Sequence, residues 1–160
     1  MKKAIFFTID SLLASGIIIT AVLLVSNFYL VEHQNVNVEY ASQDLIKVFS
    51  TLTVSQVDND YVKSLVSNGD ITNMNNTILE QIGDFWANDK LNLSANFTKN
   101  LTEDVIPKNY GFGVLINDEN IYTRNLTIKR GLVSSRSLVS GISNNSFLWG
   151  PAIIEIRVWE

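Results

Sequence analysis

The feature that most constrains this chain is an uncharged apolar block near its N-terminus. Residues 11–31 read SLLASGIIITAVLLVSNFYLV, which is 21 residues without a charged side chain. As an α-helix, such a stretch extends roughly 31 Å at 1.5 Å per residue, which matches the hydrocarbon core of a bilayer. The sequence therefore predicts a helix that spans a membrane.

The residues on either side of the block indicate its orientation. No small-x-small cleavage motif follows it, so we expect retention of the block rather than removal as a signal peptide. Lys2 and Lys3 precede the block, and positively charged residues next to a membrane helix stay in the cytoplasm. We therefore expect the N-terminus on the cytoplasmic side and everything after Glu32 outside the cell.

Small residues and one acid distinguish the first half of the block. Ser15 and Gly16 belong to a group of small residues that would let helix backbones approach closely in an apolar medium, although such residues are common in membrane helices. Asp10 is the only charged residue between Ala4 and Val31. Two roles are open for it: an interfacial residue at the helix start, or the partner of a cationic group on a neighbouring subunit.

A short basic leader, Lys2-Lys3-Ala4, is followed by Phe-Phe-Thr-Ile-Asp at residues 6–10 and then by the apolar block. This N-terminal segment resembles type IV pilins and archaeal pilin-like proteins. The resemblance covers about 30 residues of 160. It implies that a leader peptidase cuts after Ala4, or before Phe6 so that Asp10 becomes the fifth mature residue. The residues it implicates in filament assembly are Phe6, Phe7, Thr8, Asp10, Ser15 and Gly16.

Helical periodicity continues beyond the block. Apolar residues recur at spacings of three and four, and no Pro or Gly occurs within residues 17–68. The expected buried stripe is Val38, Ala41, Leu45, Val48 and Leu52. The sequence predicts one long helix with an apolar part at 5–31 and an amphipathic part at 32–66. The β-branched residues within 51–54 could interrupt it before a short helix at 61–66, which we expect to stop at 67–69 with Gly69 as a left-handed cap. An amphipathic extension of this kind docks the outer domain of a pilin.

Residues 67–160 are expected to form an outer head domain that is β-rich after residue 110. Thr77 and Glu80 fit a capping box that would start a helix. Alternation of apolar and polar residues is clearest in the last strand, where Ile154 and Ile156 would face one side. The expected elements are a helix at 77–88, a helix or irregular segment at 93–105, a hairpin of 113–116 and 121–124 around a turn at 117–120, and strands at 132–139 and 152–159. The predicted fold class is α+β, with the long N-terminal helix packed against a small C-terminal antiparallel sheet.

Possible glycan acceptors are frequent after the apolar block. Six N-x-S/T sequons occur, at Asn75, Asn92, Asn96, Asn100, Asn125 and Asn144. With 18 Asn and 25 Ser or Thr among 160 residues, chance alone gives about three. All six lie on the side expected to face outward. Two explanations are open: N-linked glycosylation, or a composition rich in Asn and Thr.

The sequence offers little to catalysis, metal binding or nucleic-acid binding. It has no cysteine and one histidine, His33, and residues 33–160 carry 10 Lys or Arg against 14 Asp or Glu. No glycine-rich phosphate loop or G-x-S-x-G motif occurs. Two acidic pairs, Asp58 with Asp60 and Asp118 with Glu119, are expected to be turn and cap residues, and the first lacks the EF-hand spacing for calcium. We predict no catalytic residue, no metal, no cofactor and no nucleic-acid partner.

These features favour a structural subunit of an extracellular type IV pilus-like filament. The N-terminal helices would bundle into a homo-oligomeric core, and glycosylated heads would face water. The implied partners are the membrane before assembly, the leader peptidase, the pilus assembly machinery and N-linked glycans. The alternative is a single-pass, membrane-anchored envelope glycoprotein that binds a ligand and does not polymerise. Adhesion, DNA transfer and motility are equally compatible with the sequence.

Overall fold

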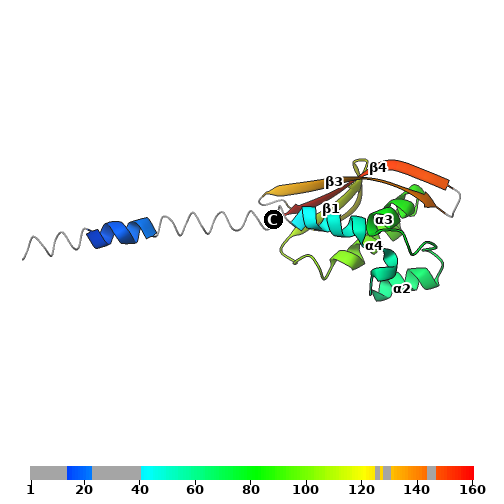
Figure 1. Cartoon of the computed structure of the whole chain (residues 1–160), viewed down its shortest axis with the longest axis horizontal. Coiled ribbons are helices and arrows are strands. Elements are labelled where there is room, and N and C mark those ends of the chain that lie inside the picture. Colours follow the sequence, from blue (N-terminus) through cyan, green and yellow to red (C-terminus); the bar gives the residue numbers. More distant parts are fainter. Residues whose placement is uncertain (1–13, 23–40, 125–126, 128–130, 144–146) are drawn as a thin grey trace, which may run out of the picture. The chain divides into compact units, whose positions relative to one another are not determined.

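The structure is a computed structural model that describes residues 14–22, 41–124, 127, 131–143 and 147–160. The chain divides into two compact units, Met1–Asn37 and Val38–Glu160. In the first unit, residues 14–22 are α-helical. No helix in these described ranges is both long and apolar enough to cross a bilayer. The second unit is an α+β domain (Figure 1).

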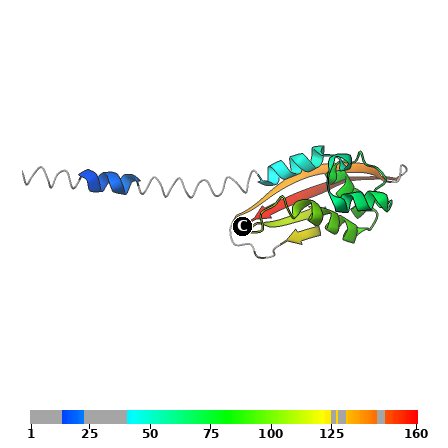
Figure 2. The same ribbon diagram turned by 90° about the horizontal axis from the view of Figure 1, so that it is seen from below.

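The second unit places helices before strands along the chain. After a helix at residues 41–51, the elements are η1 (Val54–Gln56), α2 (Asp60–Ser67), α3 (Ile78–Ala87), α4 (Leu91–Thr102), β1 (Gly111–Ile116), β2 (Glu119–Arg124), β3 (Leu132–Ser143) and β4 (Phe147–Trp159). The strands form one four-stranded antiparallel sheet in the order β2-β1-β4-β3. Figures 1 and 2 show the long β3–β4 pair running beside the helices. The predicted α+β class with a C-terminal antiparallel sheet is thus confirmed.

Local sequence signals fix where α3 begins and where α2 ends. The Thr77 hydroxyl accepts a hydrogen bond from the Glu80 N–H at 3.2 Å, and the Glu80 carboxylate accepts one from the Thr77 N–H at 2.7 Å. This confirms the predicted capping box. At the end of α2, Gly69 adopts φ +78°, and the Asp70 N–H donates to the Leu65 carbonyl at 2.9 Å. The glycine therefore closes α2 with a left-handed residue, as predicted.

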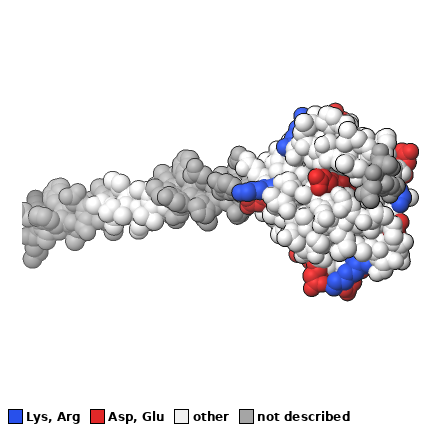
Figure 3. All heavy atoms as spheres, turned by 45° about the vertical axis from the view of Figure 1, so that its right-hand side comes forward, with Lys and Arg blue, Asp and Glu red and all other residues white. Residues whose placement is uncertain are grey.

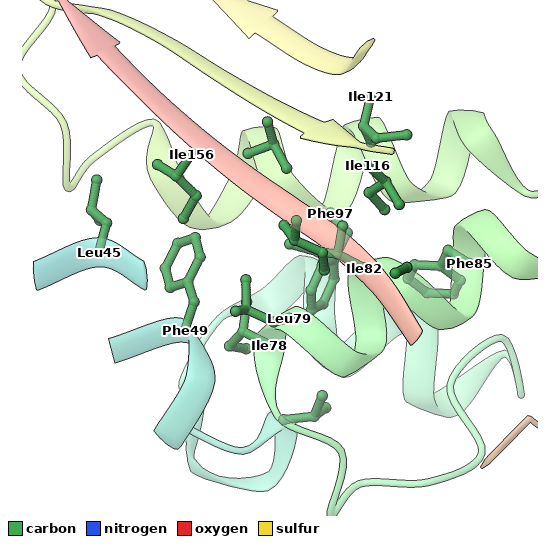
Figure 4. Packing of buried hydrophobic residues seen from close by; sticks show 14 of the residues in the cluster. Leu45, Phe49, Ile78, Leu79, Ile82, Phe85, Phe97, Ile116, Ile121 and Ile156 are labelled. Carbon is green, nitrogen blue, oxygen red and sulfur yellow. The ribbon is translucent and has the colours of Figure 1, made fainter. Parts of the chain in front are cut away.

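The helix at 41–51 packs on the sheet with a different face from the one expected. Leu45 and Phe49 are buried and point toward Ile156 of β4, whereas Val48 is 47% exposed (Figure 4). Ser42 is also buried, and its hydroxyl oxygen lies 3.0 Å from that of Ser135 in β3. The prediction that Val48 belongs to the buried stripe was wrong. Positions 42, 45 and 49 share one helix face because they are three and four residues apart.

The β1–β2 hairpin has a shorter turn than predicted. Its loop is the two-residue segment Asn117-Asp118, with φ values of +48° and +68°, and Glu119 already pairs with Ile116. Two positive φ values are typical of a type I′ turn, whose twist matches that of the flanking strands. Asn and Asp tolerate this backbone region better than other non-glycine residues. The hairpin is thus confirmed, and its expected four-residue turn is corrected to two residues.

The hydrophobic core lies between the sheet and the helices. Val114 of β1 and Ile156 of β4 are cross-strand partners and both are 0% exposed. Phe85 of α3 and Phe97 of α4 meet edge to face, with ring centroids 5.7 Å apart. Figure 4 shows side chains of α3, α4 and the helix at 41–51 directed toward the same region. Burial of each large apolar side chain contributes about 1.5–3 kcal/mol. All residues of the buried cluster belong to the second unit, so this unit contains a core of its own.

Strands β3 and β4 extend further than their alternation pattern predicted. Beyond a register shift between Val139 and Gly141, residues 141–143 pair with 147–149. Trp149 occupies space that glycines leave open, since a Cβ on Gly83 of α3 would lie 2.2 Å from the Trp149 ring. Glycines and the Gly150-Pro151 pair interrupt the apolar–polar alternation, so this part of the hairpin carries a weak strand signal.

Candidate functional site

Two of the predicted assembly residues, Ser15 and Gly16, lie in the described helix at 14–22. Both are exposed, and no described atom lies within 4 Å of a Cβ built on Gly16, its own helix backbone and chain neighbours left aside. The Thr20 hydroxyl donates to the Gly16 carbonyl at 2.8 Å, so it is satisfied within its own helix. The surface at Gly16 is therefore smooth and sterically open to a neighbouring backbone.

The same helix exposes large apolar side chains over more than half of its circumference. Ile17, Ile18 and Ile19 are 70%, 63% and 60% exposed, and Val22 is 58% exposed. Three consecutive residues span 200° of the helix circumference, so the exposed apolar surface is wider than the stripe of an ordinary amphipathic helix. Each such side chain would gain about 1.5–3 kcal/mol on leaving water. A helix of this kind is typical of a lipid or helix-bundle environment.

The other predicted N-terminal and processing residues lie outside the described residues. They are Lys2, Lys3, Ala4, Phe6, Phe7, Thr8 and Asp10. His33 and two of the sequon asparagines, Asn125 and Asn144, also lie outside them.

The remaining sequon asparagines are on the surface of the second unit. Asn75 follows α2 in a turn and is exposed. Asn92, Asn96 and Asn100 lie four residues apart in α4, and the first two are exposed while Asn100 is half-buried. The Asn100 amide donates to the Asn96 carbonyl at 2.8 Å. Segment 93–105, which the sequence left open between helix and irregular structure, is helical as far as Thr102, so these asparagines form one row.

The acidic pair at the start of α2 serves a structural role. The Asn59 side chain between the two acids caps α2 by accepting from the N–H groups of Tyr61 and Val62 at 3.0 and 3.2 Å. Lys63 forms ion pairs with both Asp58 and Asp60. Its hydrogen bond and its charge lower the pKa of Asp58 below the usual range. Across the part of the chain that the structure describes, no three His, Cys, Asp or Glu side chains are grouped as metal ligands.

The second acidic pair is divided between a turn and a long-range contact. Asp118 occupies the β1–β2 turn, as expected. The Glu119 carboxylate instead accepts a hydrogen bond from the Trp86 indole N–H of α3 at 2.7 Å. This bond joins the hairpin to the helix layer. Sequence reasoning missed it because the partner lies 33 residues away in the chain.

A shallow groove of about 520 Å³ adjoins this contact. Its lining combines aromatic and apolar side chains with two carboxylates: Trp86, Ala87, Asp89, Leu91, Glu119, Phe147, Leu148, Trp149 and Gly150. Phe147 and Leu148 are 56% and 71% exposed. The groove offers rings for stacking and carboxylates as acceptors. Among its lining residues, no nucleophile stands beside a general base.

The sheet face away from the helices carries a buried ion cluster that the sequence did not reveal. Glu155 is 4% exposed, although alternation placed it on the outward side. Its carboxylate accepts from Arg157 at 2.6 Å and from Arg136 at 2.8 Å. The hydrogen bond from Arg157 is the main cause that lowers the pKa of Glu155, and Arg136 adds to it. The cluster neutralises a carboxylate in the middle of the sheet and leaves no free acid for chemistry there.

Trp159 lies on the same face over two glycines of β1. A Cβ on Gly111 would lie 2.0 Å from the Trp159 indole nitrogen, and one on Gly113 would lie 3.4 Å from its ring. A hollow of about 260 Å³ beside the ring is lined by Gly113, Leu115, Asn120, Thr123, Leu132, Arg157 and Trp159. Gly111 and Gly113, two residues apart in a strand, are the sequence signal that could have indicated a large side chain packed over that strand.

Charges on the second unit do not form a single-sign surface on the visible face. In Figure 3, Lys and Arg lie near Asp and Glu, and broad uncharged areas separate these groups. The whole chain carries a formal net charge of −4. A basic track for a phosphate backbone is not visible on that face.

No family model matches this chain, and no curated protein or solved structure is significantly similar to it. Two features of the described residues bear most directly on function: the exposed apolar helix at 14–22 and the surface asparagines of the second unit.

Proposed function

We propose that this protein is a structural subunit of an extracellular type IV pilus-like filament. The observation that carries the proposal is the contrast between the helix at 14–22, whose apolar side chains are exposed, and the second unit, which has its own core. An all-apolar helix is stable only when other apolar groups surround it. Lipid would supply them before assembly, and N-terminal helices of other copies would supply them in the filament.

Assembly in this proposal needs no chemistry within the subunit. Lipid tails and a helix bundle are both apolar, so close packing rather than the hydrophobic effect favours the bundle. Ser15 and Gly16 would permit that close packing. Asp10 would pair with a lysine or a freed amino group of a neighbouring copy, because an unpaired charge in such a core is costly. No enzymatic activity, cofactor or nucleic acid is part of this function.

The proposed subunit has one long N-terminal helix with two tasks. Its apolar first half would span the membrane and later form the filament core, and its amphipathic second half would carry the head. Support comes from the helix at 41–51, which packs on the sheet through Leu45 and Phe49. The helix at 41–51 ends before η1 and α2, so the proposed continuous helix reaches no further than residue 51. No Pro or Gly occurs within residues 17–51 to interrupt it.

The proposed life cycle starts at the cell membrane with a cytoplasmic N-terminus. A leader peptidase would cut after Ala4 or before Phe6, and the pilus assembly machinery would then incorporate the subunit into a surface filament. N-linked glycans would decorate the head on some of its sequons.

Electron microscopy of negatively stained, sheared filaments from cells with and without this gene tests the proposal. We expect filaments to disappear on deletion and to return when the full chain is supplied. Unchanged filaments, with the protein held in the membrane fraction, would overturn the proposal in favour of a single-pass envelope glycoprotein that does not polymerise.

A further inference from the structure

The three sequons of α4 have their two essential residues on opposite sides of the helix. Asn92 and Asn96 face solvent, whereas the hydroxyl residues that complete the three sequons are 0–1% exposed: Ser94, Thr98 and Thr102. Two residues correspond to a rotation of 200° about an α-helix. The asparagine row and the hydroxyl row are therefore separate stripes, one on the surface and one in the core.

The buried hydroxyl groups already have hydrogen-bond partners. The Ser94 hydroxyl donates to the Ile82 carbonyl of α3 at 3.2 Å. The hydroxyls of Thr98 and Thr102 each donate to a carbonyl one helical turn earlier, both at 2.8 Å. Phe97, which lies beside them, packs on Phe85. The hydroxyl row is thus part of the contact between α4 and the remainder of the core.

The other described sequon residues differ from this arrangement. Thr77, which completes the sequon of Asn75, is half-buried, and its hydroxyl caps α3. Thr127, which completes the sequon of Asn125, is exposed. An N-x-S/T acceptor is defined by its hydroxyl residue as well as by its asparagine. Exposure of the hydroxyl residue therefore orders the sequons differently from exposure of the asparagine. Asn92 and Asn96 are exposed, but the hydroxyl residues of their sequons are buried.

We infer that glycans on Asn92, Asn96 and Asn100 are attached before α4 packs into the domain, and that the folded domain accepts none at these positions. The transfer forms a bond between the asparagine side-chain nitrogen and C1 of the sugar. It breaks the bond from C1 to the phosphate of a lipid-linked oligosaccharide, and a proton and the lipid phosphate leave. The inference rests on the glycosylated head of the proposed function and adds an order of events to it.

This order has a structural consequence for the finished head. Because each asparagine is four residues from the next, neighbouring attachment points are separated by about 6 Å along α4. Asn92 and Asn96 are exposed, so glycans attached there need not disturb the packing of Phe97. The three glycans would form one carbohydrate ridge whose occupancy depends on how rapidly α4 folds.

A transfer assay on folded protein and on peptides tests the inference. The full chain is purified without glycans in detergent, and its fold is checked by circular dichroism. It is then incubated with a single-subunit oligosaccharyltransferase and a lipid-linked oligosaccharide. Synthetic peptides of residues 88–106 and 121–131 provide the matched unfolded substrates. Glycopeptide mass spectrometry gives the rate at each asparagine.

At Asn92, Asn96 and Asn100 we expect the folded chain to react at least about 100-fold more slowly than the peptide, because only a minor, locally opened population presents the hydroxyl. At Asn125 the two rates should agree within about tenfold, since Thr127 is exposed. Phe97→Ala should raise the rates on α4 selectively by loosening its packing.

Equal rates for folded chain and peptide on α4 would overturn the inference. An unreactive α4 peptide would also overturn it, because these sequons would then not be acceptors. A 100-fold loss at Asn125 would show that hydroxyl burial is not what decides access. The assay measures sugar transfer only, so failure of the filament proposal would appear separately in the electron micrographs.

Discussion

The helix at 14–22 and the domain at 38–160 use apolar side chains in opposite ways. Ile17, Ile18 and Ile19 follow one another and are all largely exposed, whereas Ile154 and Ile156 alternate with other residues and are 0% exposed. Periodicity is what separates the two regions, since both are rich in isoleucine and valine. A periodic pattern can be buried within the chain, and a continuous run requires an apolar partner outside it.

Separating the two units should have the largest effect on the behaviour of this protein. A chain of residues 38–160 retains the complete core of the second unit and lacks the apolar block. We expect it to be soluble and monomeric, with a folded sheet. Analytical ultracentrifugation and circular dichroism would check both properties.

The full chain in detergent is the matched control for this truncation. It should remain bound to micelles or self-associate. Filaments formed by residues 38–160 alone would show that assembly does not require the N-terminal helix. The proposed role of the apolar helix as the assembly element would then be wrong.

Much of the domain could be predicted from local sequence signals. The Thr77 capping box, the Gly69 helix end and the alternating last strand are each defined by a few adjacent residues, and each is confirmed. These signals act through backbone geometry over one turn or one strand. They are therefore visible without knowledge of the tertiary structure.

The features that sequence reasoning missed depend on contacts between distant segments. The Trp86–Glu119 bond joins residues 33 positions apart, and Glu155 is buried by arginines that include Arg136 on the next strand. Val48 was misplaced because spacing alone permits two adjacent helix faces, and the sheet selects the one with Phe49. The assembly residues stay a prediction: Ser15 and Gly16 are exposed in the described helix, and Asp10 and the leader lie outside the described residues.

Replacement of Asp10 tests whether the N-terminal unit assembles through a charge pair. Asp10→Asn should leave the protein in the membrane at a normal level and deplete filaments, since loss of one partner of a desolvated pair costs on the order of 3–5 kcal/mol. Immunoblots of membranes and filament yield from sheared cells would be measured together. Neutralising Lys2 and Lys3 should instead disturb topology or processing. A normal filament yield from Asp10→Asn would exclude the charge pair and leave Asp10 as an interfacial residue at the start of the helix.

Matched isoleucine substitutions in the two units test whether burial decides what each side chain contributes to stability. Ile156→Ala removes a side chain that is 0% exposed, and we expect the free energy of unfolding to fall by about 2–5 kcal/mol. Ile18→Ala removes one that is 63% exposed, so the unfolding of the second unit should change by less than about 0.5 kcal/mol. Urea unfolding followed by tryptophan fluorescence would compare them. Similar losses would contradict the independence of the two units.

The smallest expected effect concerns the open face of the sheet and depends on pH. Hydrogen bonds from Arg157 and Arg136 lower the pKa of Glu155 from its ordinary value of 4.5 in the folded state. A carboxyl group whose pKa is lower in the folded state than in the unfolded state stabilises the folded protein when it is ionised. The reason is that its ionised form has more favourable interactions in the folded protein than in the unfolded chain. The contribution is complete above about pH 5 and is lost as the pH falls from 4.5 through the folded pKa.

Glu155→Gln should therefore lower stability at pH 7 and flatten its decline in acid. We expect a loss of about 1–3 kcal/mol at neutral pH, less than for a fully buried pair, because the Arg136 side chain is 60% exposed and that of Arg157 is 33% exposed. Leu138→Ser on the same face is the control: Leu138 is 69% exposed, and its replacement leaves the carboxylate in place. Urea unfolding at pH 7, 5 and 3 would resolve the two variants. If Glu155→Gln and wild type lose stability in parallel between pH 5 and 3, the ion cluster does not contribute to the acid sensitivity of the domain.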